Sequence, residues 1–336
     1  MAYQLRSALS IALAGTRTLF MRTVEPQVYD FVFILWELDW VLYGICKDLR
    51  SELEKRGCTV RFAVWPGIIP KGRVYFFSHH TLIAPRVLRW VLPAEAKKLV
   101  LFTHYRARQN VDRLIPRLNS CHHIFAMNSM LAGQLICDGL DTKRVSIELG
   151  FADPRKFYVE AAIDRSYIGF VANYLPDAHY GARKNYELLF KLALHLSISN
   201  NVLLIGKGFR SSEFAPLLTK STSLKYVEAK YSDFRTHYNQ MKVFVSVSRL
   251  EGGPIALLEA MMCGCIPVAT NTGFSSDLIE HQKNGLIIQD QSNFEQIVTL
   301  IDRAMLMENP DNISNSVTHH SFQHFANRLI EEGLSV

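Results

Sequence analysis

The stretch that decides the fold is residues 243–264, VFVSVSRLEGGPIALLEAMMCG. It opens with a β-rich apolar run, continues through Gly252, Gly253 and Pro254, and then takes the apolar spacing of a helix. A strand, loop and helix of this kind is the repeating unit of a parallel sheet with helices on its faces. The glycines allow close backbone approach, and Pro254 can occupy the first helical position, where its missing N–H costs nothing. The stretch therefore predicts an α/β fold.

The same stretch predicts an anion site. Backbone N–H groups around Gly253 and Ile255, together with the positive end of the helix dipole, are expected to face a diphosphate at the carboxyl edge of the sheet. Glu251 lies in the loop and Glu259 lies more than a turn inside the helix, so the two carboxylates cannot form a close acid–base pair. A carboxylate accepts paired hydroxyl hydrogen bonds, so we expect them to bind two sugar-like ends of one extended ligand.

Outward from this stretch, strands and helices alternate along two parts of the chain, which predicts two doubly wound Rossmann-like domains. In the first part we expect strands over 31–36, 59–64, 73–78, 98–103, 123–127 and 145–149, and helices over 43–55, 84–92, 109–118 and 129–139. In the second part we expect strands over 167–172, 201–205, 224–227, 243–247 and 266–269, and helices over 185–196, 214–218, 234–241 and 255–263. The predicted division is a basic amphipathic segment (1–25), two domains (26–155 and 156–310), and a terminal helical segment (311–336) that packs back on the first domain.

Composition agrees with a folded protein of two domains. The chain has 336 residues, of which 49% are hydrophobic and 20% are charged. It has no uninterrupted apolar run of about 18 residues, the length that a membrane span needs. Six cysteines without paired metal-ligand spacing indicate reduced thiols in a cytoplasmic protein.

Charge is distributed unevenly along the chain. Residues 1–150 hold 20 Lys and Arg against 12 Asp and Glu, and the remaining residues hold 17 against 19. A basic first half predicts contact with an anionic surface such as lipid headgroups or a phosphorylated acceptor, and a merely solvated basic face is the alternative. In residues 1–25, Arg6, Arg17 and Arg22 flank a short apolar run. An amphipathic helix on the protein body or on a membrane surface fits this pattern better than a secretory signal.

The decisive stretch continues in a recognisable order. Cys263-Gly-Cys-Ile-Pro-Val-Ala269 forms a small-residue turn and a following strand, Asn271-Thr-Gly-Phe274 a glycine loop, and Asn284-Gly-Leu-Ile287 a closing strand. Residues 243–288 thus resemble the region of two glutamates eight residues apart in the retaining glycosyltransferases of the glycogen synthase-like, or group 1, family. Ile147 to Asp153 is similar to the turn that joins the two domains of that family.

The resemblance implies a GT-B fold, in which two Rossmann-like domains face each other across a cleft, with the acceptor on the first domain and the nucleotide-sugar on the second. It implies that Glu259 binds the donor ribose and that Glu251 contacts hydroxyls of the transferred sugar. Taken singly, each glutamate reads as an ordinary solvated charge. The spacing, the Gly-Gly-Pro insert and the preceding strand favour the functional interpretation.

The family also places an Arg and a Lys on the donor diphosphate, and Lys184 fits the Lys position. Ala172-Asn173 stands where Gly-Arg is usual, and the loop over 174–182 is longer than usual, so Arg183 is the candidate substitute. Gly206 and Gly208 form a bare Gly-x-Gly that can approach the nucleotide, a weak signal alone. Tyr231 falls in the zone that holds the base, and a buried core tyrosine is the alternative.

In the first domain the resemblance points to His104, after a strand, as the histidine that reaches the transferred sugar. His79 and His80 compete with it, and a structural histidine is the alternative for His104. A bulky segment, Trp36-Glu-Leu-Asp-Trp40, replaces the glycine-rich loop that many relatives have after the first strand.

We expect a retaining glycosyltransferase that moves a hexosyl or deoxyhexosyl unit from a nucleotide-diphosphate sugar to a hydroxyl of a glycan or lipid-linked acceptor, in polysaccharide or glycolipid assembly. No cofactor, metal or nucleic acid is expected, since neither an Asp-x-Asp pair nor a His/Cys cluster is present. The expected location is the cytoplasm, with peripheral contact at the inner face of the membrane. The alternatives are an inactive GT-B scaffold or nucleotide-sugar-binding protein, then a nucleotide-sugar epimerase. A dinucleotide oxidoreductase is disfavoured because Gly-x-Gly-x-x-Gly follows the first strand of neither domain.

Overall fold

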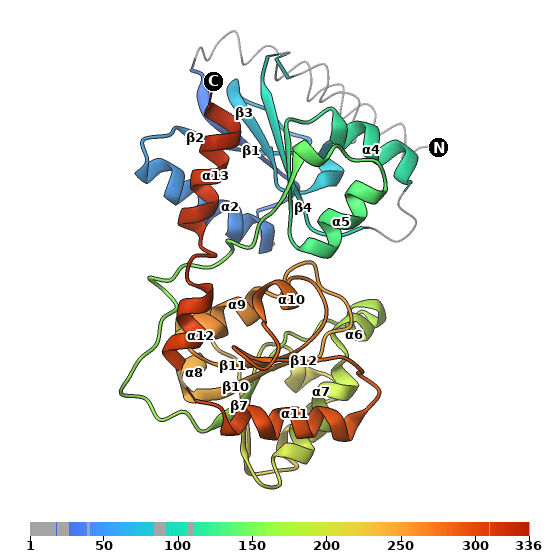
Figure 1. The fold of residues 1–336 in the computed structure, drawn as a ribbon, viewed down its shortest axis with the longest axis vertical. Helices are drawn as coiled ribbons and strands as arrows, with labels where there is room; N and C mark the ends of the chain where they lie inside the picture. Colours follow the sequence, from blue (N-terminus) through green and yellow to red (C-terminus); the bar gives the residue numbers. More distant parts are fainter. Residues whose placement is uncertain are drawn as a thin grey trace. The chain divides into compact units, whose positions relative to one another are not determined.

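A computed structural model describes residue 18 and residues 27–38, 41–83, 92–93, 95–105, 110–308 and 310–335. The chain divides into two compact units, one of residues 1–150 with 322–336 and the other of residues 151–321 (Figure 1). Apart from Thr18, the expected amphipathic segment over 1–25 lies outside the described residues, as does the expected helix over 84–92 apart from Leu92.

The first unit contains a six-stranded parallel sheet in the order β2-β1-β3-β4-β5-β6. Its strands are β1 (Tyr29–Leu35), β2 (Val60–Val64), β3 (Gly72–Phe77), β4 (Lys97–Phe102), β5 (His123–Ala126) and β6 (Val145–Ile147). The helices described in this unit are α2 (Val41–Lys55), α4 (Val111–Asn119), α5 (Ser129–Cys137) and α13 (Phe322–Leu334). Because the central strands are buried on both faces, they read as continuous apolar runs in the sequence.

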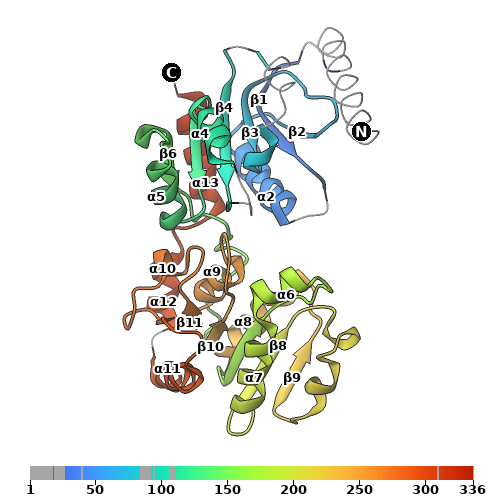
Figure 2. The same ribbon diagram turned by 90° about the vertical axis from the view of Figure 1, so that its right-hand side faces the viewer.

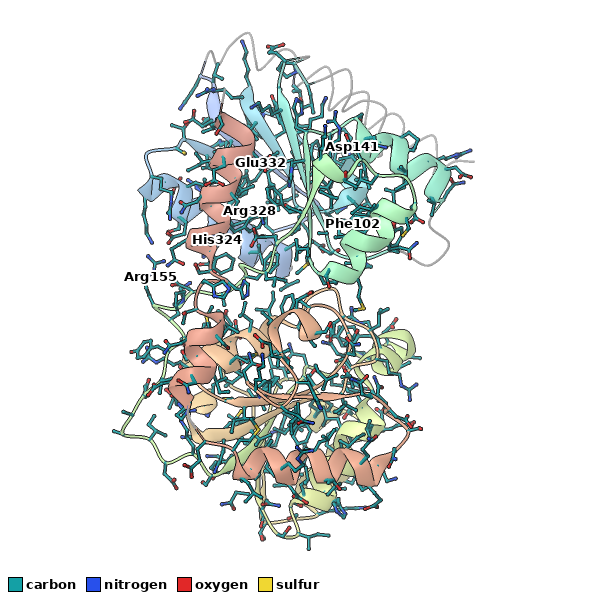
Figure 3. All side chains as sticks on the ribbon, in the orientation of Figure 1. Phe102, Asp141, Arg155, His324, Arg328 and Glu332 are labelled. Carbon is teal, nitrogen blue, oxygen red and sulfur yellow. The ribbon has the colours of Figure 1, made fainter. Side chains whose placement is uncertain are left out.

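Helix α13 belongs to this unit although it follows the second unit in sequence (Figure 2). Its Phe325 ring lies 6.0 Å from that of Phe76 and 5.1 Å from that of Phe125, on the face opposite the core that α4 and α5 share with the sheet. Arg328, also on α13 (Figure 3), donates to the Ile147 carbonyl oxygen at 2.6 Å. The helix therefore completes one layer of the first unit.

The second unit repeats the architecture with a parallel sheet in the order β12-β11-β10-β7-β8-β9. Its strands are β7 (Tyr167–Val171), β8 (Asn201–Ile205), β9 (Leu224–Val227), β10 (Met241–Ser246), β11 (Ile266–Thr270) and β12 (Leu286–Ile288). Its helices are α6 (Ala178–Lys184), α7 (Tyr186–Leu196), α8 (Phe234–Gln240), α9 (Ile255–Met262), α10 (Ser275–Leu278), α11 (Phe294–Leu306) and α12 (Pro310–Val317). Figure 1 shows α9 and α12 on one side of this sheet and α7 and α11 on the other.

One segment of the second unit differs from the sequence expectation. The residues expected as a long loop over 174–182 include a short helix, α6, which runs on to Lys184. Asp177 caps this helix by accepting from the Tyr180 N–H at 2.7 Å. The helix ends at Asn185, which has a left-handed backbone with φ 56° and ψ 50° and separates α6 from α7. Lys184 therefore ends one helix instead of starting the next.

No described helix of either unit is long and apolar enough to cross a bilayer. Both units have parallel sheets layered by helices, which is the α/β class predicted from the sequence. In such sheets ligands bind outside the carboxyl ends of the strands. That edge of the second unit carries the loops after β7, β8, β9 and β10, in which most of the candidate residues lie.

Candidate functional site

The loop between β10 and α9 leads into a helix as the anion-site prediction requires, but it differs from that prediction at two residues. Pro254 is the N-cap of α9 and not its first helical residue. The Ile255 N–H, expected to be free, donates to the Gly253 carbonyl oxygen at 2.9 Å, because the chain turns sharply there. The Gly253 N–H has no acceptor among the described residues. The loop from Glu251 to Ile255 is half-buried, as a binding loop should be.

The glycine loop after β11 supports this turn. The Glu251 N–H donates to Thr272 Oγ1 at 3.0 Å. Gly273 has φ 56°, and a Cβ there would lie 2.9 Å from Pro254 Cδ and 3.0 Å from the Gly252 carbonyl oxygen. Only glycine combines this backbone conformation with so close an approach. The loops after β10 and β11 thus hold each other in place, and this contact also fixes the backbone at Glu251.

Lys184 and Glu251, which the sequence assigned to different parts of the donor, form an ion pair. The Lys184 Nζ lies 2.5 Å from Glu251 Oε1, and the side chains are 21% and 9% exposed. A charge-assisted bond between partly buried groups is stronger than a surface ion pair. The structure therefore brings a cation and a carboxylate together beside the glycine turn.

Asn185 positions this lysine. Its buried side chain donates from Nδ2 to the Val247 carbonyl oxygen at the end of β10, at 3.3 Å. Asparagine tolerates the left-handed conformation better than most residues. Arg183 takes a different direction, because its guanidinium lies 4.8 Å from the centre of the Tyr180 ring on its own helix. Its carbonyl oxygen accepts from the Arg249 N–H at 2.8 Å, which joins the end of α6 to the loop after β10.

Glu259 is only 2% exposed, within a helix whose neighbouring residues are apolar and buried. Its carboxylate accepts from Tyr231 at Oε1 and from Tyr238 at Oε2, the latter at 3.0 Å. Burial and the neighbouring Glu259 carboxylate raise the pKa of Tyr238 well above its ordinary value, so this phenol stays protonated and remains a donor. Phe157 packs on both tyrosine rings. Two tyrosine hydroxyls thus compensate the buried Glu259 carboxylate, and aromatic rings surround it.

Gly206 and Gly208 are needed to bring two loops together. A Cβ at Gly206 would lie 1.6 Å from the Ala172 carbonyl oxygen, and one at Gly208, which has φ 87°, would lie 3.0 Å from the Tyr174 carbonyl oxygen. Asn173, which stands where the family usually has arginine, accepts from the Lys207 N–H at 3.0 Å through Oδ1. This asparagine therefore closes the two loops onto each other and carries no charge.

A cavity of about 410 Å³ lies in the same unit. Its lining comes from residues 174–178 before and within α6, from later residues of α6, from the start of α7, and from Glu213, Phe214 and Arg249. None of the residues predicted to bind the donor lines it. The assignment of the candidate site therefore rests on the contacts of Lys184, Glu251 and Glu259 and not on this hollow.

In the first unit, His104 belongs to a group of three histidines at the carboxyl ends of β3 and β4. Its ring centre lies 5.6 Å from that of His79 and 6.4 Å from that of His80. His79 and His80 are each 1% exposed, whereas His104 is half-buried. The Thr81 N–H and hydroxyl lie within hydrogen-bond distance of His79 Nδ1, and the Trp36 indole donates to that hydroxyl at 2.9 Å. His104 is thus the most accessible of the three.

Among the described residues, no three His, Cys, Asp or Glu side chains gather as metal ligands. Beside the glycine turn of the second unit, Lys184 supplies a cation. Two carboxylates, one paired with a lysine and one held by two tyrosines, can accept hydrogen bonds from sugar hydroxyls.

Comparison with known proteins finds a family match in the second part of the chain. Residues 178–317 match the family model described as "Glycosyl transferases group 1". The match covers 140 of the 336 residues, all of them in the second unit. An uncharacterized glycosyltransferase of Haemophilus influenzae is 27% identical to this chain over 317 residues, which cover 90% of this chain and 81% of that protein.

Solved structures confirm the fold of this chain. Sucrose-phosphate synthase of Thermosynechococcus elongatus aligns with a TM-score of 0.70 at 13% identity, over 91% of this chain and 98% of that one. HepE of Anabaena, solved with UDP and glucose, aligns with a TM-score of 0.65 at 11% identity, over 91% and 97%. These neighbours are GT-B glycosyltransferases, and the fold type predicted from the sequence is confirmed.

Sequence reasoning missed two residues of the site. Tyr238 reads as one more core aromatic, and Asn185 as an ordinary residue at a helix start. A signal was present for the first, because Glu259 stands in an apolar helix and a buried carboxylate needs donors. For the second, the signal was the location of Asn185 directly after the candidate lysine.

Proposed function

We propose that this glycosyltransferase transfers a hexosyl or deoxyhexosyl unit from a nucleoside-diphosphate sugar to an acceptor hydroxyl with retention of configuration. The observation that carries the proposal is the contact of Lys184 with Glu251 beside the glycine turn at the start of α9. A lysine and backbone N–H groups at that place suit a diphosphate, and a carboxylate next to them suits the hydroxyls of the sugar attached to it.

The residues then take separate roles. Glu259 receives the donor ribose, and Glu251 the transferred sugar. Lys184 and the Gly253 N–H stabilise the charge that develops on the diphosphate leaving group. No metal is required, because this charge is met by the lysine and the backbone. The solved structure of HepE with UDP and glucose supports a nucleotide-sugar as the ligand of this fold.

Glu251 must leave Lys184, or share it, when the donor binds. A lysine has three N–H donors, so one ammonium can contact both the carboxylate and a phosphate oxygen. The pair keeps the partly buried carboxylate compensated until the diphosphate arrives. Arg183 contributes to the end of α6 through its carbonyl oxygen and is not assigned to the phosphate. Gly206 and Gly208 shape the neighbouring loops and are not in themselves binding groups.

The acceptor is proposed to be a glycan or a lipid-linked sugar, with assembly of a polysaccharide or glycolipid as the context. The excess of basic residues in the first 150 favours acceptors carried near an anionic surface in the cytoplasm. His104 is the candidate that the first unit offers to the sugar. The same site without turnover would be that of a nucleotide-sugar-binding scaffold, which is the second candidate because Asn173 replaces the usual arginine.

The proposal is tested by binding and by turnover. Thermal melting with UDP, GDP and ADP and their glucose or mannose conjugates should show stabilisation by one nucleoside diphosphate, and Glu259→Ala should lose most of it. Glu280→Ala is the matched control, because Glu280 is exposed and its hydrogen bonds go to Lys283 and Asn284 and to none of the candidate residues. If no nucleotide shifts the melting temperature, the assignment of the donor site is contradicted. Binding without release or transfer of sugar would favour the scaffold.

The anomeric outcome needs its own experiment. Nuclear magnetic resonance of the first product formed from an α-linked donor should show an α-linkage. A β-linked product would contradict retention and leave the transferase assignment intact.

A further inference from the structure

The carboxylate of Glu259 has both oxygens engaged by tyrosine hydroxyls of its own unit. Tyr231 donates to Oε1 and Tyr238 donates to Oε2. A ribose that binds this carboxylate needs the same oxygens, because its hydroxyl groups are donors of the same kind. A carboxylate can accept more than two hydrogen bonds, but Glu259 is only 2% exposed, so a ribose can reach these oxygens only where a tyrosine moves aside.

The two tyrosines differ in how easily each can leave. Tyr238 lies on α8, is fully buried, and packs its ring 6.1 Å from that of Phe244 on β10. Tyr231 lies on the 3₁₀ turn η5 (Tyr231–Asp233) after β9 and is 53% exposed. Its neighbours Lys230 and Ser232 are exposed too. Exposed turns open locally at little cost, whereas a packed helix does not. Tyr231 is thus the partner that can be displaced.

We infer that Tyr231 is a stand-in for the donor ribose: its hydroxyl occupies on Glu259 Oε1 the place of a ribose hydroxyl and leaves when the nucleotide binds. Tyr238 stays on Oε2 and is a positioning residue, since it holds the carboxylate toward the ligand. The inference rests on the proposed function, because it takes a nucleoside diphosphate as the ligand of Glu259.

This arrangement has a consequence for specificity. In the exchange one hydrogen bond to Oε1 is lost and one is gained, while the Tyr231 hydroxyl moves to water. Every ribonucleotide therefore binds with its affinity reduced by the cost of releasing Tyr231. A ligand that lacks ribose hydroxyls leaves Tyr231 on Oε1 and does not carry this cost, so Tyr231 narrows the preference for ribonucleotides. Without Tyr231 the difference in affinity between the two kinds of ligand should widen.

The test is a cycle of protein and ligand changes, measured by titration calorimetry on the full chain. The ligands are the nucleoside diphosphate among UDP, GDP and ADP that binds most tightly, and its 2′,3′-dideoxy form. Tyr231→Phe keeps the ring and removes only the competing hydroxyl. It should lower the Kd of the ribonucleotide about tenfold and leave that of the dideoxy form unchanged. Tyr238→Phe should raise the Kd of the ribonucleotide about tenfold.

Tyr226→Phe is the matched control. Tyr226 donates to Glu228 at 2.8 Å in an exposed tyrosine–glutamate pair of the same unit, so its loss should leave both dissociation constants unchanged. An unchanged or higher Kd of the ribonucleotide in Tyr231→Phe overturns the inference and leaves the proposed function standing. An equal gain for the dideoxy form overturns it too, because the effect would not depend on ribose hydroxyls. If the wild type binds no nucleoside diphosphate, the proposed function and the inference both fall.

Discussion

The Lys184 ammonium and the Glu251 carboxylate, 67 residues apart in sequence, meet at 2.5 Å beside the first turn of α9. The cation expected for the diphosphate and the carboxylate expected for the transferred sugar therefore neutralise each other before any donor is present. Removing either partner leaves the other as an uncompensated charge in a partly buried place. Substitutions at the two positions should have opposite effects on binding.

Glu251→Gln keeps the shape of the side chain and releases Lys184. We expect the Kd of the nucleoside diphosphate to fall a few-fold, while sugar transfer drops by about 100-fold or more because the contact to the transferred sugar weakens. Lys184→Met should raise that Kd about 10- to 100-fold. Calorimetry and a transfer assay with labelled donor give the two quantities. Weaker nucleotide binding in Glu251→Gln would show that the pair is not a competitor of the diphosphate.

Asn185 separates two effects, its backbone conformation and its hydrogen bond to Val247. Asn185→Gly retains the left-handed backbone and loses the side-chain bond, so it should cost about 1 kcal/mol in the free energy of unfolding. Asn185→Ala loses both, and the strain at φ 56° should add a further 1 kcal/mol or so. Urea denaturation measures both variants. Equal stability of the two would mean that the backbone conformation imposes no cost.

Gly206 should tolerate no side chain. In Gly206→Ala the new methyl would fall 1.6 Å from the Ala172 carbonyl oxygen, so the loops after β7 and β8 must separate. We expect a loss of about 3 kcal/mol or more in the free energy of unfolding, with weaker nucleotide binding. Gly133→Ala in α5 is the control, since nothing lies within 4 Å of its Cβ position and a helical alanine should stabilise by about 0.5–1 kcal/mol. A harmless Gly206→Ala would contradict the close approach.

The first unit should show opposing pH effects. Burial raises the pKa of Glu148 from 4.5 to about 7, against the opposing effect of Arg328, so its contribution to stability is complete below pH 4.5 and is lost as the pH rises to about 7. Burial lowers the pKa of His123 from 6.5 to about 4, with Arg328 adding to the effect. That contribution is complete above pH 6.5 and is lost as the pH falls toward 4. The two contributions oppose each other between pH 4.5 and 6.5.

Glu148→Gln should therefore leave the pH dependence of stability that comes from His123 without the opposing contribution of Glu148. Its melting temperature should rise with pH from 4.5 to 6.5 more steeply than that of the wild type, and in His123→Gln the melting temperature should fall as the pH rises from 4.5 to 7. Differential scanning calorimetry across pH 4.5–8 checks both. Parallel curves for all three proteins would mean that neither group titrates as its burial requires.

The strands of both sheets could be predicted closely because their runs are apolar and bounded by turns. β8 and β9 begin and end at the residues expected, and β10 begins two residues earlier. Helix α6 was missed because seven residues that contain Gly181 give no clear helical period. Its capping by Asp177 and its stop at a left-handed Asn185 are visible only when the chain is folded.

The candidate site was predictable as a set of residues and not as a set of contacts. The spacing of Glu251 and Glu259 correctly separated them into two environments. That Lys184 would contact Glu251, and that Tyr231 would donate to Glu259, depend on how the loops after β7, β9 and β10 meet, which no local pattern encodes. The same holds for Asn173, whose side chain closes a loop where a charge was expected.

The place of α13 in the first unit has a consequence for the order of folding during synthesis. Phe325 and Leu329 are buried parts of that unit, yet the ribosome adds them only after the whole of residues 151–321. The second unit is continuous in sequence and can complete its core as it emerges. The first unit must wait with an apolar face uncovered until its last helix arrives, so it is the part of the nascent chain that most needs protection from aggregation.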